Sequence, residues 1–230
     1  MADNDDSLIE ALNQANAGVA PSPFGRLELT IPGSPASVQS AKDVRDAYIS
    51  SIKAALAHYK FVLTGQLVLD IVWLLPAKSR YETDAKADID NCIKPIIDAF
   101  TGPDGIFIND CQLKGLYICW RHITSNDERL NFQFEFDADQ WCERDGLAFI
   151  RLSRGLCCPV NTTWPMEVRR AWVESVRTGE LAKTALEVTG VSYLALAAMT
   201  GGGQPFHATR TGGFPVMSAD DFVAGGREEA

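Results

Sequence analysis

The stretch Gln66–Leu75, QLVLDIVWLL, is a strongly apolar run rich in β-branched residues, and Pro76 follows it directly. A short apolar run with many β-branched side chains that ends at a proline is typical of a strand rather than a helix. Asp70 is its one conspicuous polar residue. The run therefore predicts a central strand, around which the neighbouring segments are expected to pack.

Upstream of this strand, the chain predicts a second strand and a helix. Leu27–Ile31, LELTI, alternates between apolar and polar residues and is closed by Pro32 and Gly33. Residues 41–60 carry apolar side chains at helical spacing. These side chains are Val44, Tyr48, Ile49, Ile52, Ala55 and Leu56.

Downstream, residues 77–88 are polar and predict an irregular loop, and residues 90–100 then predict a helix whose apolar face is Ile93, Ile96, Ile97 and Phe100. Three further apolar or alternating stretches predict strands. They are residues 106–108, 113–122 and 130–136. The resulting order, β-α-β-loop-α-β-β-β, indicates a compact α/β domain of about 110 residues, which is a common domain size.

The two ends of the chain differ from this domain. Residues 1–25 are expected to form a flexible acidic segment, residues 26–137 the α/β domain, and residues 138–230 a mainly helical extension with a loose tail from residue 204. Helices are predicted over 166–176, 180–188 and 191–199. The last two resemble a helix-turn-helix, but the second of them lacks the Arg, Lys, Asn and Gln side chains that read base edges, so a buried helical hairpin is favoured.

Composition narrows the class of protein. The chain has 230 residues, of which 46% are hydrophobic, and this excludes a wholly disordered or collagen-like protein. No apolar run is long enough for a spanning helix, and the acidic N-terminal region does not resemble a signal peptide, so a soluble, cytoplasmic protein is expected. The net charge is −9, with 21 basic and 30 acidic residues, which argues against a protein that coats DNA non-specifically. The six cysteines are expected to be reduced and mostly buried.

The chemistry of the chain is concentrated around residues 88–110. Asp88 and Asp90 stand two apart where a loop enters the predicted helix, Lys94 and Asp98 follow at four-residue steps on its polar side, and Asp110 comes after the next predicted strand. Carboxylates that lie close together repel unless a cation sits between them. Oxygen ligands without His or Cys suit Mg²⁺ or Mn²⁺, which can polarise a phosphodiester and activate water. This pattern therefore suggests a nuclease that acts by in-line displacement.

The same residues also have an ordinary structural interpretation. An Asp-x-Asp-Asn sequence before a helix is a common capping pattern, and a lysine between two aspartates at four-residue steps is a routine salt-bridge ladder. Spacing alone leaves both interpretations open.

The run Ala87–Leu113 resembles the signature of the RusA-type Holliday junction resolvases. Leu29–Pro35 is similar to the opening strand and turn of that family, and the resemblance covers about residues 26–137. The matching residues of the signature are Asp88, Asp90, Asn91, Lys94, Asp98, Ala99 and Asp110. This resemblance implies a small two-layer mixed sheet with helices on one face, and a homodimeric, Mg²⁺-dependent endonuclease that resolves four-way DNA junctions by paired nicks. It also implies a role in DNA recombination and repair, with phage DNA processing as one setting.

The resemblance also implies roles for individual residues. Asp88, Asp90 and Asp110 would be the catalytic metal ligands, with Mg²⁺ as the cofactor and Mn²⁺ as an alternative. Lys94 would place its ammonium near the scissile phosphate, and Asn91 and Asp98 would support these residues. The position before Asp110 is Asn109, where many family members carry an acid.

Several basic residues near this signature are candidate DNA contacts, although each is also explained as a solvated surface charge. They are Lys78, Arg80, Lys86, Lys114, Arg121 and His122. Trp73 and Trp120 lie in predicted strands and are expected in the core. Two other functions stay open: a related nuclease acting on another branched DNA, and a catalytically weak DNA-binding or adaptor protein, which the acidic net charge favours.

Overall fold

The computed structural model describes residues 10–11, 13–84, 86–152, 155–192, 195 and 205–225. The chain divides into two compact units, Met1–Trp141 and Cys142–Ala230, which are described separately. The mixed α/β class expected from the sequence is confirmed.

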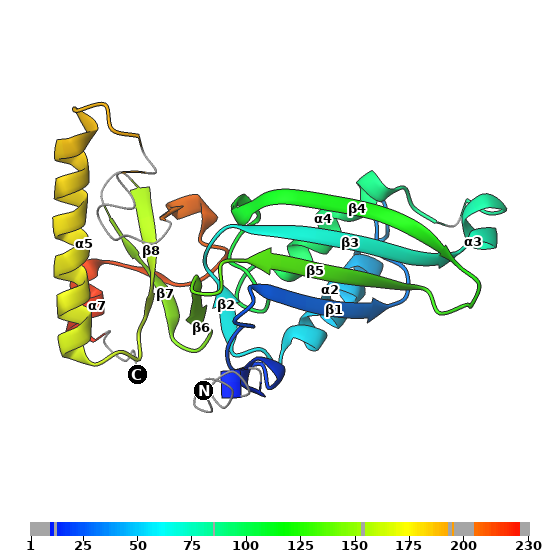
Figure 1. Ribbon diagram of the computed structural model, residues 1–230, viewed down its shortest axis with the longest axis horizontal. Helices are drawn as coiled ribbons and strands as arrows, with labels where there is room; N and C mark the ends of the chain where they lie inside the picture. Colours follow the sequence, from blue (N-terminus) through cyan, green and yellow to red (C-terminus); the bar gives the residue numbers. More distant parts are fainter. Residues whose placement is uncertain are drawn as a thin grey trace, which may run out of the picture. The chain divides into compact units, whose positions relative to one another are not determined.

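The first unit is built on a four-stranded mixed sheet (Figure 1). Its strand order is β1-β5-β3-β4, in which β5 is antiparallel to both of its neighbours and β4 is parallel to β3. The strands are β1 (Arg26–Pro32), β3 (Leu67–Pro76), β4 (Leu113–Ile123) and β5 (Arg129–Phe136). The apolar run that follows Gln66 is therefore an interior strand, as predicted, with every second residue from Leu67 to Leu75 buried.

Two helices, α2 (Lys42–Leu56) and α4 (Ile89–Phe100), cover one face of this sheet. They pack Ile52, Leu56, Ile96 and Phe100 into a single apolar core with the buried side chains of the strands. On the other face, β1 and β5 carry mainly polar residues at alternate positions, because successive side chains of a strand point to opposite faces. Burial of one face alone explains why β1 and β5 alternate so regularly in sequence.

Shorter elements connect these strands and helices. They are β2 (Phe61–Leu63), α3 (Ala77–Tyr81) and the 3-10 helix η1 (Asp110–Gln112). Two differ from the sequence analysis: α3 lies in the expected loop, and β2 was not expected. The strand predicted over residues 106–108 is reduced to isolated bridges of Phe107 with Leu63 and Thr101, because the segment is too short to continue a ladder.

A proline inside α4 ties this helix to a distant loop. Pro95 has no backbone N–H and cannot bond the carbonyl of Asn91, four residues earlier. That carbonyl instead accepts a hydrogen bond of 2.8 Å from the backbone N–H of Val38. The loop before α2 thus completes the first turns of α4, where the predicted site residues lie.

The second unit contains a four-stranded sheet that was not predicted. The strand order is β10-β7-β8-β9, with β10 parallel to β7 and the other pairs antiparallel. In chain order, the elements of the second unit are β7 (Leu147–Arg151), β8 (Leu156–Asn161), α5 (Met166–Glu187), β9 (Phe206–His207), the 3-10 helix η3 (Ala208–Arg210), β10 (Val216–Met217) and α7 (Ala219–Ala224). A further short strand, β6 (Trp141–Glu143), lies across the boundary of the two units.

The helices of this unit differ in detail from the prediction. The stretches 166–176 and 180–188 form one helix, α5, because Gly179 is tolerated inside it without a break. Residues 205–225, expected in a loose tail, form β9, η3, β10 and α7 around the buried rings of Phe206, Phe214 and Phe222. The helix predicted over 191–199 falls almost wholly outside the described residues.

Two general expectations can be compared with the described ranges. All six cysteines lie in these ranges and are free thiols, with Cys92 and Cys157 buried. Within the same ranges, no helix has both the length and the apolar character needed to cross a membrane.

Candidate functional site

Asp88 stands at the N-cap position of α4, but its side chain does not cap the helix. Its backbone is extended (φ −73°, ψ 152°), and within the described residues its carboxylate accepts no capping hydrogen bond. Instead, Asp88 Oδ1 accepts a hydrogen bond of 3.0 Å from Arg80 Nη2, while the Asp88 side chain stays 69% exposed. The capping interpretation therefore does not account for this carboxylate, which faces solvent and an arginine.

Asp90 lies in the first turn of the same helix and is exposed. The charges at this end of α4 affect the pKa of the neighbouring Cys92 thiol. Burial raises the pKa of this thiol to about 11, with further increases from the Asp90 and Asp88 carboxylates and an opposing effect of Arg80. The two carboxylates and the guanidinium are therefore gathered around the start of α4.

Lys94 and Asp98 continue the polar stripe of α4 and form an ion pair with each other. Both side chains are largely accessible, and the apolar residues of α4 are buried on the opposite side. The ladder interpretation therefore holds for this pair. The ion pair with Asp98 keeps the exposed Lys94 ammonium on the same stripe as Asp90.

Asp110 begins η1, and a buried network holds it in place. The preceding Asn109 forms a capping box with Gln112. Gln112 Oε1 accepts hydrogen bonds from the backbone N–H groups of Ile108 and Asn109, and Gln112 Nε2 donates to the carbonyls of Leu63 and Gly65. Asp110 itself is exposed. Sequence reasoning missed Gln112, because a lone glutamine has no motif that marks it as buried.

The three predicted ligands do not form one cluster within a single chain. Among the described residues, no group of three or more His, Cys, Asp or Glu side chains is placed to hold a metal ion. The pair Asp88 and Asp90 still fits Mg²⁺ by the nature of its donors, because this ion commonly takes one or two carboxylates and completes its shell with water and substrate phosphate oxygens. Asp110 remains outside that pair.

The loop that leads to Asp88 is anchored by a largely buried ion pair. Lys86 Nζ lies 2.5 Å from Glu128 Oε2 and 2.7 Å from Ser34 Oγ, and both charged side chains are less than one-fifth exposed. Trp73 Nε1 also donates to Glu128, at 2.9 Å. Lys86 was expected to contact DNA, but its ammonium is committed to Glu128, so its evident contribution is to position the loop.

Of the other predicted DNA contacts, Arg80 is largely covered, with its side chain 23% exposed, and the remaining four lie at the surface. Arg80 bonds Asp88 and, at 3.3 Å, the carbonyls of Lys86 and Ala87. Lys78 lies 3.7 Å from Glu82 in an exposed pair. Lys114, Arg121 and His122 are exposed along β4. Trp73 is buried in the core as expected, and Trp120 packs against it while remaining half-buried.

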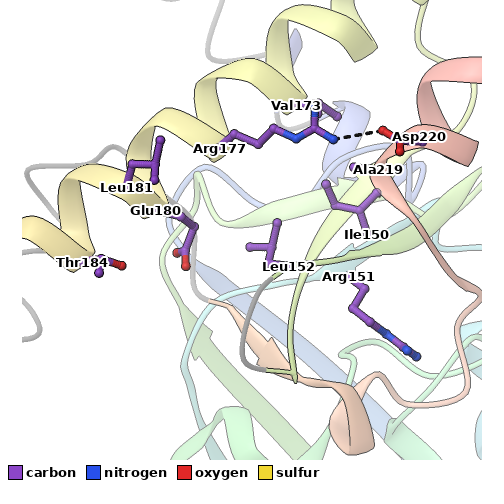
Figure 2. Close-up of a pocket in the computed structure, with 10 residues that line it drawn as sticks. All are labelled: Ile150, Arg151, Leu152, Val173, Arg177, Glu180, Leu181, Thr184, Ala219 and Asp220. Atoms are coloured by element: carbon purple, nitrogen blue, oxygen red, sulfur yellow. Dashed lines mark hydrogen bonds and ion pairs between the residues drawn. The ribbon is translucent and has the colours of Figure 1, made fainter.

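The second unit contains a cavity of 520 Å³ between β7, α5 and α7 (Figure 2). Figure 2 shows Ile150 and Leu152 on one side of it and Leu181 on the other, with the Arg177–Asp220 ion pair of 3.0 Å at its edge. The cavity contains none of the residues that the sequence analysis selected. The carboxylates of the first unit are therefore the better candidate for a catalytic site.

Comparison with protein families matches residues 34–132 to endodeoxyribonuclease RusA. The matched region runs from the turn after β1 into β5, and so contains Asp88, Asp90, Lys94 and Asp110. A comparison with curated proteins gave no match. The fold of the first unit and this match lead to one conclusion: residues 34–132 of the chain, which include the candidate site, are similar to the endodeoxyribonuclease RusA family.

Proposed function

We propose that this protein is a Mg²⁺-dependent endodeoxyribonuclease that resolves four-way DNA junctions by paired, symmetric nicks. The family match supports an endonuclease acting on Holliday junctions. The observation that carries the proposal is the pair Asp88 and Asp90 at the start of α4, where the Asp88 carboxylate is exposed and not used as a helix cap. A purely structural role for Asp-x-Asp-Asn would have placed that carboxylate on the backbone.

Each residue of the site has a role that its environment favours. Asp88 and Asp90 would hold the ion, and Asp110, which lies outside that pair, is proposed as a third catalytic carboxylate on the resemblance alone. When bound, Mg²⁺, or Mn²⁺ in its place, supplies polarisation of the phosphodiester and a nucleophilic water at neutral pH. Lys94 would place its ammonium where negative charge builds on the phosphate, and Asp98 holds that ammonium on the helix surface. Asn91 fixes the helix start through its carbonyl.

A homodimer suits this activity. Two-fold symmetry places two equal sites against the two strands that a symmetric resolution must cut. The exposed basic residues Lys78, Lys114 and Arg121 are proposed to contact phosphates, and their small number predicts weak binding whose dependence on salt is shallow. Such an enzyme would act in DNA recombination and repair.

The test is nicking of a labelled four-way junction at low salt with Mg²⁺, comparing the wild type with Asp90→Asn and Asp98→Asn. We expect paired, symmetric nicks from the wild type, a loss of about a hundredfold or more in Asp90→Asn, and retention within about tenfold in Asp98→Asn. Omission of Mg²⁺ should abolish nicking by all three proteins.

A panel of fork, flap and linear duplex substrates separates the proposal from its alternatives. Preferred cutting of a fork or flap would replace the junction with another branched DNA as substrate. Junction binding without any cutting, by a wild type supplied with Mg²⁺ or Mn²⁺, would overturn the nuclease proposal in favour of a binding or adaptor protein.

A further inference from the structure

An aromatic cluster lies beside the carboxylates and takes no part in the proposed metal chemistry. Its members are Tyr81 at the end of α3 and Trp120 and His122 on β4. The Tyr81 ring centroid lies 6.1 Å from that of Trp120 and 5.4 Å from that of His122, and the last two centroids are 4.9 Å apart. We call these three residues the Tyr81 cluster.

Tyr81 is not a core residue. Its side chain is 68% exposed, and none of the five described residues of α3 is buried. A tyrosine at such a position usually moves freely in solvent, but this ring is held against two others, with interplanar angles of 77° to Trp120 and 56° to His122. The cluster therefore presents a large aromatic surface to solvent that is already ordered.

Arg80 connects the Tyr81 cluster to the candidate metal site. Its guanidinium carbon lies 5.8 Å from the centroid of the Trp120 ring, while Nη2 of the same group bonds Asp88 at 3.0 Å. One side chain thus contacts both the aromatic cluster and a proposed metal ligand. A nucleotide next to a phosphate that a cation holds at Asp88 would have its base near the rings.

We propose that the Tyr81 cluster binds an unstacked nucleobase next to the scissile phosphate, at the branch point of the DNA. This inference rests on the proposed function and specifies how the same site selects its substrate. In linear duplex both faces of each base are covered by neighbours, whereas at a branch point stacking is interrupted and a base can leave at low cost. Stacking on aromatic side chains is strong and tolerant of sequence, as expected for selection by structure.

The cluster also has the charge needed for this task. Arg80 adds a cation next to the Trp120 ring, and Lys78 is exposed on the same helix, α3. These cations offset the acidic balance of the chain locally, where phosphates flanking the bound base would lie. His122 remains able to donate a hydrogen bond from its ring.

The test uses a four-way junction that carries 5-iododeoxyuridine at the branch point, bound to the full-length protein in EDTA so that nothing is cut. Near-ultraviolet irradiation crosslinks this base to an aromatic ring stacked on it, and peptide mapping is expected to find the crosslink at Tyr81. The same label placed in the middle of an arm should give no crosslink at this position.

Binding of variants gives the second readout. Tyr81→Ala is expected to weaken junction binding about tenfold while linear duplex binding changes less than about twofold, and Tyr81→Phe should keep the wild-type affinity. Tyr117→Ala is the matched control, since Tyr117 is also an exposed tyrosine, at 55%, and lies on β4 outside the cluster. Because Tyr81 is exposed, its removal should leave the thermal midpoint unchanged.

The outcomes separate this inference from the proposed function. Absence of the Tyr81 crosslink, with equal junction affinity of Tyr81→Ala and wild type, overturns the role of the cluster even if the wild type nicks junctions normally. A Tyr81 crosslink together with the tenfold binding loss supports the proposed role of the cluster. That support holds even if the wild type with Mg²⁺ cuts no DNA, because such a result would overturn only the nuclease proposal.

Discussion

Gln112 is the residue on which the position of Asp110 depends. Each of its two amide atoms makes two hydrogen bonds. Two of the four go to the turn before η1, and two go to the carbonyls of Leu63, at the end of β2, and Gly65. Because Gln112 is itself fully buried, water cannot replace these bonds if the side chain is shortened. Removal of the Gln112 side chain would therefore cost stability mainly because these backbone N–H and carbonyl groups would lose their hydrogen-bond partners.

Gln112→Ala is expected to lower the free energy of unfolding by about 3 kcal/mol or more, since each buried backbone group left unpaired costs about 1–3 kcal/mol. Urea unfolding followed by circular dichroism measures the change. Gln39→Ala, at an exposed position, serves as the control and should stay within about 0.5 kcal/mol of wild type. A loss below about 1 kcal/mol in Gln112→Ala would show that the network does not hold the turn.

At the scale of elements, regular periodicity explains which parts were predictable. β3 and β5 and the polar stripe of α4 repeat at the strand and helix periods, so their positions and buried faces follow from the sequence. α3, with the sequence AKSRY, has no apolar period, and β8 contains Pro159, so both escaped prediction. Spacing likewise could not show whether Asp88 caps its helix.

Contacts between distant elements were beyond prediction for a different reason. The ion pair of Lys86 with Glu128 joins residues 42 positions apart, and nothing local marks either residue as buried. Burial alone would raise the pKa of the Glu128 carboxyl, but its hydrogen-bond donors and the lysine charge lower it by more, so that the net pKa lies below its ordinary value. The pair is therefore a stabilising contact that depends on pH.

Glu128→Gln tests this contact. The Glu128 carboxyl has a lower pKa in the folded protein than in the unfolded chain, where it lies near 4.5. Its contribution to the free energy of unfolding is therefore complete above pH 4.5 and is lost as the pH falls through the folded-state pKa. We expect the variant to be less stable by about 2 kcal/mol at pH 7, below the range for fully buried pairs because the pair is partly accessible. The difference should shrink as the pH falls below about 4.5.

Urea unfolding of wild type and variant at several pH values measures this change. Glu135→Gln, at an exposed position on β5, the strand that begins directly after Glu128, is the matched control and should differ little from wild type at any pH. A stability difference for Glu128→Gln that is the same at pH 7 and at pH 3.5 would rule out the ion pair as its source.

At the scale of the whole molecule, each unit has its own apolar core. The core of the first unit is formed by residues between Ile31 and Phe134, and that of the second by Ala148, Ile150, Val160 and their neighbours. The family match and all of the candidate catalytic residues fall in the first unit. The first unit thus has the features of an independently folding domain.

A fragment of residues 1–141 is accordingly expected to unfold cooperatively in urea and to nick a four-way junction within about tenfold of the full-length rate. Circular dichroism and the junction assay measure the two properties. The full-length Asp90→Asn variant provides the background rate. A folded fragment that has lost nicking would assign to the second unit a part in substrate binding or dimer formation.

The proline in α4 has a consequence for observing this protein at work. Because Pro95 leaves the carbonyl of Asn91 to the N–H of Val38, that single amide proton is bonded to the turn of helix that bears Asp90. Its rate of exchange with deuterated water measures how often this turn opens, without any label or mutation near the carboxylates. Val38 is therefore a built-in reporter, readable by nuclear magnetic resonance, of whether DNA or metal tightens the site.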